Sequence, residues 1–416
     1  MTTSLCNSPV TLQNILLKYG GAFRSHHPIP YPAHKILNAV ERCHTPALGA
    51  HVIRCHTPEC TYEKVAYNSC RNRHCPGCQG SQSARWVGQR EEELLPVPYF
   101  HVCFTLPHEL NPLVLANKKI LYDCLFASAW EAMATLIETR KDFSVQGGAI
   151  AVLHTWGQNL MDHPHVHMIV PGGALDKGKG VFRQRGVRRN KKGVKARDFL
   201  VPVGPLRILF KNKFLAKLGR AYKEEQLIFP GQAEPLSSPS CFYAMKEALF
   251  AKNWVVYCKE PFAGPKQVLA YLGRYTHRVA ISNSRLQSME DGKVTFKLKN
   301  YRKEGNREVM VLPAAEFLRR FLLHALPKGY RRIRMFGFLS NRYKRKNLET
   351  IRALLNVTPV KDETVELEKG SQVGEKKAKP SVAEVILKST GVNVLLCPKC
   401  GQCGLRLIRP IGRGSG

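Results

Sequence analysis

The stretch at residues 153–170, LHTWGQNLMDHPHVHMIV, contains four of the fifteen histidines in the chain. Its last eight residues are apolar except for histidine, which is typical of a buried strand. Side chains alternate along a strand, so His165 and His167 share one face and Val166 lies on the other. Two imidazoles side by side can bind a divalent metal ion. The alternative interpretation is that these histidines are half-buried polar residues at a sheet edge. It does not explain why two imidazole rings are aligned on one face.

The neighbouring strand supplies the candidate for a third ligand. GGAIAVLHT (147–155) predicts a strand that ends on His154, and YFHVCFTLP (99–107) predicts another that proline terminates. A metal that acts on a substrate needs three protein ligands and open positions beside them. His154 is the preferred partner of the two histidines, and Gln158 and His163 are the alternatives.

Cysteines are concentrated in the first hundred residues. Cys55 and Cys60 are followed, after 14 residues, by Cys75 and Cys78 in RNRHCPGCQ. Two such pairs predict a structural zinc site with four ligands in a tetrahedron. A second site or a different choice of four is also open, because further candidates remain: Cys43, His51, Cys70 and His74.

The charge of the chain indicates its partner. Lys and Arg number 64 against 31 Asp and Glu, a formal net charge of +33. This excess favours nucleic acid over acidic lipid, since no amphipathic basic helix stands out. Residues 177–197 hold ten basic residues and no acid, which predicts a phosphate-contacting loop. Its expected DNA contacts are Arg188, Arg189, Lys191 and Lys192.

Two further segments fit a nucleic-acid protein. GYRRIRMFGFLSNRYKRKN (329–347) mixes basic residues with Tyr330, Phe336, Phe338 and Tyr343, as single-strand binding requires. In GPKQVLAYLGRYTHRVAISNSRL (264–286) a helix is predicted to about residue 277. Tyr271 and Tyr275 share one face of it, with Arg274 and Arg278 beside them. Tyrosines at this spacing usually belong to a core, but these flanking residues argue against burial.

Together these features indicate phosphoryl transfer on DNA. A bound cation polarises a non-bridging phosphate oxygen, and a tyrosine hydroxyl can attack in line to give a covalent phosphotyrosine and a free hydroxyl. The covalent bond conserves the cleaved linkage, so rejoining needs no ATP. The sequence shows no obvious general base, which leaves metal-bound water or solvent.

The chain resembles the rolling-circle insertion-sequence transposases of the HUH class, in the two-tyrosine branch with an N-terminal zinc-binding domain. The resemblance covers about residues 10–350 and rests on SCRNRHCPGCQ (69–79), LHTWGQNLMDHPHVHMIVPGG (153–173) and YLGRYTHRVAISNSRL (271–286). It implies an α+β fold whose HUH nuclease domain has a central antiparallel sheet, beside a small zinc-binding domain. One departure from the family pattern is the wide spacing of Cys55 and Cys60.

The resemblance also implies the chemistry. His165 and His167 match the metal-binding motif, and Tyr271 and Tyr275 match the nucleophiles. Tyr275 is favoured as the primary one, because single-tyrosine relatives retain a similar context around one tyrosine. Family members use Mg²⁺ or Mn²⁺ to nick one strand at an element end and transfer it to target DNA. A host helicase is an assumed partner.

The expected organisation has three parts: a zinc-binding domain at 1–95, a nuclease domain at 96–350 with the basic insertion at 177–197, and a linker and cysteine-containing tail at 351–416. Cys397, Cys400 and Cys403 in the tail are either half of a zinc knuckle or a remnant. With no signal peptide and no apolar run of about 20 residues, the expected location is the cytoplasm and nucleoid, with reduced cysteines.

Two alternatives to a transposase remain at this stage. A plasmid replication initiator or relaxase would use the same HUH chemistry, although the zinc module and the lack of a helicase or primase segment argue against it. A non-catalytic zinc-containing DNA-binding protein would keep its DNA function after substitution of the histidines and tyrosines.

Overall fold

The computed structural model describes residues 10–138, 145–184, 200–259, 267–268, 273, 280–300, 306–356, 381, 383–384, 387 and 393–412. Its centre is a five-stranded sheet in the order β13-β5-β6-β3-β9, antiparallel throughout. The strands are β3 (Tyr99–Thr105), β5 (Gly148–Trp156), β6 (Asp162–Pro171), β9 (Val256–Lys259) and β13 (Ile333–Gly337). The predicted α+β fold with a central antiparallel sheet is confirmed.

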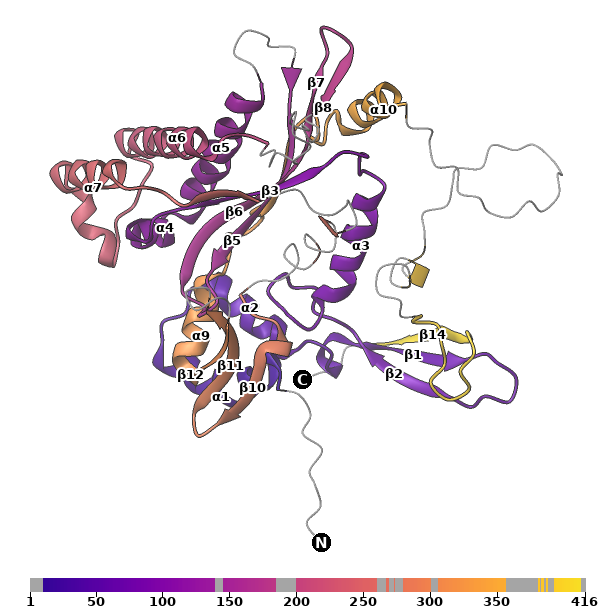
Figure 1. Ribbon diagram of the computed structural model, residues 1–416. Coiled ribbons are helices and arrows are strands. Elements are labelled where there is room, and N and C mark those ends of the chain that lie inside the picture. Colours follow the sequence, from indigo (N-terminus) through magenta and orange to yellow (C-terminus); the bar gives the residue numbers. More distant parts are fainter. Residues whose placement is uncertain are drawn as a thin grey trace.

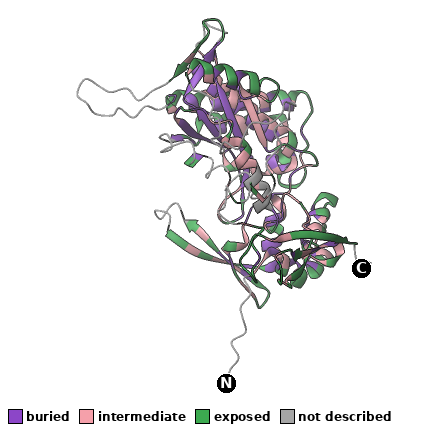
Figure 2. Cartoon of the chain, turned by 90° about the vertical axis from the view of Figure 1, so that its right-hand side faces the viewer, coloured by how far each residue is buried: buried purple, intermediate pink, exposed green. Residues whose placement is uncertain are grey.

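Helices cover one face of this sheet (Figure 1). They are α4 (Asn111–Ala116), α5 (Lys118–Ile137), α6 (Val203–Lys223) and α7 (Pro239–Ala251). Alternate residues of each strand, such as Val102, Leu153 and Val166, form a single buried core with these helices. Figure 2 shows the buried strands enclosed in this lobe of the molecule. Because the opposite face is also largely covered, the three central strands are buried on both sides.

The helices α4 and α5 meet at Asn117. The Asn117 side chain accepts a hydrogen bond from the Ile228 amide at 2.8 Å and donates to the Ile228 carbonyl at 2.8 Å. These bonds to a distant loop hold Asn117 outside helical geometry, at φ −120° and ψ 40°. By length and composition α5 would suffice to cross a membrane, but its apolar residues pack in the core between the sheet and α6.

The other face of the sheet carries the histidines and a smaller core. Tyr99, Val152 and Ile169 point from the strands into this core, where Leu348 of α10 (Lys344–Leu354) joins them. The helix α3 (Gln79–Glu91) lies on this side of the sheet, opposite α5 and α6 (Figure 1). A small sheet of β4 (Val145–Gln146), β7 (Gly173–Asp176) and β8 (Val181–Gln184) borders it.

The N-terminal helices form a second lobe with a distant part of the chain. α1 (Leu12–His26) and α2 (Tyr31–Glu41) pack on α9 (Ala314–Leu323) and on the sheet of β10 (Leu286–Glu290), β11 (Lys293–Asn300) and β12 (Asn306–Pro313). The sequence fits these elements, since Thr11 caps α1 in a reciprocal pair with Asn14 and apolar residues line one face of each helix.

A fourth sheet joins segments from near the two ends of the chain. β1 (Ala50–Cys55) lies between β2 (Glu63–Tyr67) and β14 (Leu405–Ile411), and both pairings are antiparallel. In Figure 1 the C-terminal strand lies along the hairpin of the N-terminal region, and Figure 2 shows the exposed segment near the C-terminus. The tail after residue 392 is therefore an integral part of a sheet.

Candidate metal centres

Three histidines converge on one face of the central sheet. The register places His154 of β5 opposite His165 of β6, and Val152 opposite His167. One ring nitrogen from each of the three histidines lies within 4.8 Å of the others. The antiparallel pairing explains this, because side chains of paired residues emerge on the same face. The structure thus brings together the three residues chosen from the sequence.

The two alternative candidates for the third metal ligand, His163 and Gln158, lie at the margin of the histidine cluster. His163 is exposed, and its ring centroid is 5.0 Å from that of His165. Gln158 lies in the turn between β5 and β6, where its carbonyl accepts a hydrogen bond from Arg285 at 2.5 Å. His154 occupies a position between the two β6 histidines, with its ring 4.5 Å from His167 and 5.3 Å from His165.

Hydrogen bonds orient the β6 rings. His165 Nδ1 lies 2.6 Å from the carbonyl of His163, to which it donates. His167 Nδ1 lies 2.8 Å from His101 Nε2, on the neighbouring strand β3. Contacts of this kind at Nδ1 fix the direction of a metal-binding imidazole ring. His101 was not identified from the sequence, although its position in the predicted strand 99–107 could have placed it on the histidine face.

Burial favours the ligand form of the histidines. Desolvation lowers the pKa of His165 to about 3, and the nearby His163 and His101 act in the same direction. The imidazole is therefore neutral at physiological pH, the form that coordinates a metal. Three imidazole nitrogen donors fit a first-row divalent ion such as Mn²⁺ better than Mg²⁺, which prefers oxygen ligands.

Asp162, at the start of the same strand, does not belong to this site. Strand alternation turns its carboxylate to the helix-covered face, where desolvation raises its pKa to about 7 against the opposing effect of Lys118. The described part of the chain supplies no hydrogen-bond partner to either carboxylate oxygen. A carboxylate behind the sheet cannot take a proton from a substrate in front of it.

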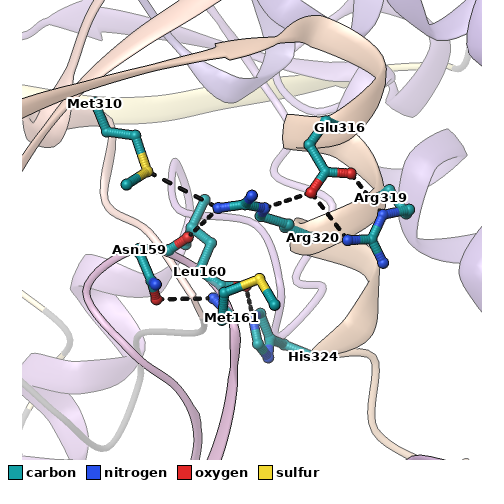
Figure 3. Close-up of polar contacts among 8 residues, drawn as sticks. All are labelled: Asn159, Leu160, Met161, Met310, Glu316, Arg319, Arg320 and His324. Carbon is teal, nitrogen blue, oxygen red and sulfur yellow. Dashed lines mark hydrogen bonds and ion pairs between the residues drawn. The ribbon is translucent and has the colours of Figure 1, made fainter.

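The turn between β5 and β6 is held by α9 (Figure 3). His324 Nε2 donates to the Leu160 carbonyl at 3.0 Å, and Arg320 donates to the Asn159 carbonyl at 3.1 Å. Glu316 in turn accepts hydrogen bonds from both Arg319 and Arg320. These contacts link the second lobe to the hairpin that carries the three histidines.

The cysteines form two clusters, which corrects the predicted zinc site. Four thiols from the N-terminal region meet in one cluster: Cys43, Cys70, Cys75 and Cys78. Cys55 and Cys60 meet Cys397 and Cys400 of the tail in the other. The prediction that Cys55, Cys60, Cys75 and Cys78 share one site is wrong, because the β1–β2 hairpin carries the first pair away from the start of α3.

The N-terminal cluster has the features of a structural zinc site. Cys70 and Cys78 have their Sγ atoms 3.6 Å apart, close to the edge of about 3.8 Å expected for thiolates around tetrahedral zinc. His74 is not a ligand, because its Nδ1 contacts Asn72 Oδ1 at 3.1 Å and its Nε2 accepts from the Leu326 amide at 3.4 Å.

Several predicted residues fall outside the described part of the chain: Tyr271, Tyr275, Arg274, Arg278, Arg188, Arg189, Lys191 and Lys192. Two residues near these tyrosines in the sequence, Val268 and Gly273, are described. Val268 packs in the core on the histidine face of the sheet. The carbonyl of Gly273 accepts a hydrogen bond from Ser83 of α3 at 2.5 Å, and a Cβ at Gly273 would lie 2.5 Å from Val87.

A pocket of about 710 Å³ lies along the edge strand β13. Basic and aromatic side chains line it, namely Trp86, Lys119, Lys328, Arg331, Arg334 and Phe336. Arg334 is ion-paired with Asp123, which leaves the basic residues in excess. Of the aromatic residues predicted to stack on bases, Phe338 is fully buried in the core, whereas Tyr343 is 49% exposed.

Comparisons with known proteins find transposase families and transposase relatives. A family model described as "Transposase zinc-binding domain" matches residues 15–106, and one described as "Putative transposase" matches residues 148–347. The chain is 39% identical to the "Putative transposase y4qJ" of Sinorhizobium fredii over 96% of its length and 94% of that protein. It is 30% identical to the transposase for insertion sequence element IS801 of Pseudomonas savastanoi pv. phaseolicola, over 72% of this chain and 68% of that one. No solved structure matches the chain.

Proposed function

The chain belongs to the IS91 family of two-tyrosine rolling-circle transposases with an N-terminal zinc-binding domain, and we propose that it nicks and rejoins single-stranded DNA at element ends through a 5′-phosphotyrosine. The observation that carries this proposal is the convergence of His154, His165 and His167 on the face of the sheet where Val268 packs, three residues before Tyr271.

The proposed reaction has two transesterifications. The hydroxyl oxygen of Tyr275 attacks the phosphorus of one linkage, the bond from phosphorus to the 3′ oxygen breaks, and the tyrosine proton passes to solvent. The DNA 5′ end is then held on tyrosine, and a 3′ hydroxyl is free. In the second step a 3′ hydroxyl of target DNA attacks this phosphotyrosine and releases the tyrosine. Tyr271 is the second nucleophile of the pair.

The histidines hold the catalytic metal in this proposal. His154, His165 and His167 would provide three nitrogen ligands, and the bound ion would polarise the scissile phosphate. The donor set favours Mn²⁺ over Mg²⁺. The chain itself contributes the preorganisation: a neutral imidazole at His165, Nδ1 atoms of His165 and His167 held by His163 and His101, and the sheet that carries the three rings.

The pocket at β13 supports a path for single-stranded DNA. β13 pairs with β5, and its residue Ile333 lies opposite Val152, two residues before His154 on the same strand. Lys119, Lys328 and Arg331 could hold phosphates, and Trp86 and Phe336 provide surfaces for stacking. The basic residues of 177–197 are proposed as further contacts to the phosphates of DNA. DNA at element ends and target sites and a host helicase are the proposed partners, and the cytoplasm and nucleoid the proposed location.

A covalent-adduct assay tests the function. Purified protein, Mn²⁺ and a labelled single-stranded oligonucleotide from an element end should give a shifted protein band on a denaturing gel, and EDTA should abolish it. Tyr275→Phe should lose most of the adduct, while the double variant Tyr271→Phe and Tyr275→Phe should lose all of it and still bind DNA. Adduct formation by the double variant would place the nucleophile elsewhere.

A further inference from the structure

We propose that Cys55, Cys60, Cys397 and Cys400 bind a second zinc ion, which fastens the C-terminal segment to the β1–β2 hairpin. The other cysteine cluster lies within residues 15–106, which the zinc-binding family model covers, whereas half of this one comes from about 290 residues beyond its end. The inference is independent of the transposition chemistry, because it concerns metal content and the attachment of the tail.

The spacing of the thiols fits zinc and excludes disulfides. Cys55 and Cys400 have their Sγ atoms 3.7 Å apart, and those of Cys60 and Cys397 are 3.8 Å apart. Zinc–sulfur bonds of about 2.3 Å in a tetrahedron require edges of about 3.8 Å, while a disulfide requires about 2.05 Å. Two pairs that are non-adjacent in sequence have this spacing at once, so coordination of one ion explains both.

Each pair of cysteines lies on a tight turn that presents its thiols. Cys55 ends β1, and its sulfur accepts a hydrogen bond from the Thr57 amide at 3.5 Å, while the Cys60 amide donates to the Thr57 carbonyl at 3.1 Å. On the tail, the amide of Gly401 donates to the Cys397 carbonyl at 2.9 Å. Amide bonds to sulfur and turns of this length are typical of zinc ligand loops.

The backbone between the two turns is closely packed. His56 donates its amide to the Gly404 carbonyl at 2.8 Å. A Cβ at Gly404 would lie 2.5 Å from Thr57 Oγ1 and 2.8 Å from the Cys55 sulfur. Only glycine allows the backbone at residue 404 to come this close to Cys55 and Thr57. The glycine therefore fits the contact between the tail and the β1–β2 hairpin.

The tail gains little from hydrophobic burial. Six of the seven β14 residues are exposed, and Leu407 is 68% exposed. An edge strand held mainly by backbone hydrogen bonds is weakly attached, since such bonds exchange with water at little net gain. A structural zinc site adds binding free energy directly to the folded state, so the metal would supply the missing attachment.

Metal content tests the proposal. The purified wild-type chain should contain two Zn²⁺ by mass spectrometry of the eluted metal. Cys397→Ser with Cys400→Ser should contain one, as should Cys55→Ser with Cys60→Ser. The matched control is Cys403→Ser, a third tail cysteine outside the cluster, which should keep two. The zinc that remains in each double variant shows that the N-terminal cluster is still folded. One zinc in the wild type, or two in the double variants, would overturn the proposal.

Attachment of the tail provides a second readout. A site for a specific protease inserted between residues 360 and 380 allows the chain to be cut before the tail. After cleavage the tail fragment should elute with the body in gel filtration, and in the Cys55→Ser and Cys60→Ser variant it should elute alone. A tail that leaves the cut wild type, or one that stays with the cut variant, would contradict a zinc fastening.

Discussion

His101 shows how one side chain beside the histidine cluster can control a metal site. Its Nε2 atom lies 2.8 Å from His167 Nδ1, and its ring stacks on that of His167 with centroids 4.9 Å apart. When His167 binds a metal ion through Nε2, its Nδ1 carries the proton and donates a hydrogen bond to His101 Nε2. Partners of this kind fix the tautomer and the direction of the ligand ring.

We expect His101→Leu to weaken Mn²⁺ binding about 10- to 100-fold, the usual effect of removing such a partner. His101→Gln retains an acceptor oxygen and should recover part of the affinity. Mn²⁺ titration followed by electron paramagnetic resonance measures this, with zinc content as a check on folding. His108→Ala is the control, since that side chain is 85% exposed. Equal affinities for the Leu variant and the wild type would remove His101 from the site.

At the scale of elements, the helix α9 and the β5–β6 hairpin act as one unit. His324 joins the two ends of the turn, since its Nδ1 accepts from Thr155 Oγ1 at 3.1 Å and its Nε2 donates to the Leu160 carbonyl at 3.0 Å. Leu160 has a positive φ of 62°, which a branched side chain adopts only under such restraint. Burial lowers the pKa of His324 to about 3, so its ring stays neutral.

His324→Ala should lower the free energy of unfolding by about 2–4 kcal/mol, because two buried polar groups lose their partners. It should also weaken Mn²⁺ binding, since the turn between the ligand strands is loosened. Urea denaturation gives the first quantity and hydrogen exchange of the amides at 157–161 gives the mobility of the turn. Arg319 lies on α9 and, among the described residues, its side chain bonds to Glu316 of that helix and not to the turn, so Arg319→Ala should change neither quantity. Unchanged exchange in the His324 variant would show that α9 does not hold the hairpin.

At the scale of the whole molecule, the N-terminal region depends on residues far along the chain. Leu12, Leu37 and Cys75 share a core with Phe296, Phe317 and Phe321. The side chain of Arg73 bonds the Tyr330 carbonyl at 2.6 Å, which joins the N-terminal zinc loop to the segment before β13. The expected boundary at residue 95 therefore crosses a continuous core.

A fragment of residues 1–106 should not fold cooperatively on its own, because half of its core is missing and its apolar helix faces would be exposed to water. We expect strong binding of the dye ANS and a thermal transition without a sharp midpoint by circular dichroism, with the intact chain as the control. A fragment that unfolds cooperatively and does not bind the dye would show that residues 281–323 are dispensable for this lobe.

Local features of the fold were accessible from the sequence. The strands at 99–107, 147–155 and 163–170 and the shared face of His165 and His167 follow from periodicity, proline positions and β-branched residues. The choice of His154 depended on one further step, the antiparallel pairing of adjacent strands joined by a short connection. His101 was missed because its pairing with β6 spans 66 residues of sequence.

The sequence by itself determined which three histidines lie on neighbouring strands, the excess of basic residues and the concentration of cysteines near the N-terminus, because these depend on side-chain chemistry and on spacing within a few residues. Only the tertiary structure decided how the cysteines are shared, since Cys55 and Cys400 are 345 residues apart, and no periodic pattern relates residues at that separation. The same holds for the core that unites α1 and α2 with α9. Contacts of this kind arise from packing the whole chain, where burial and geometry select one partner among many of equal chemistry.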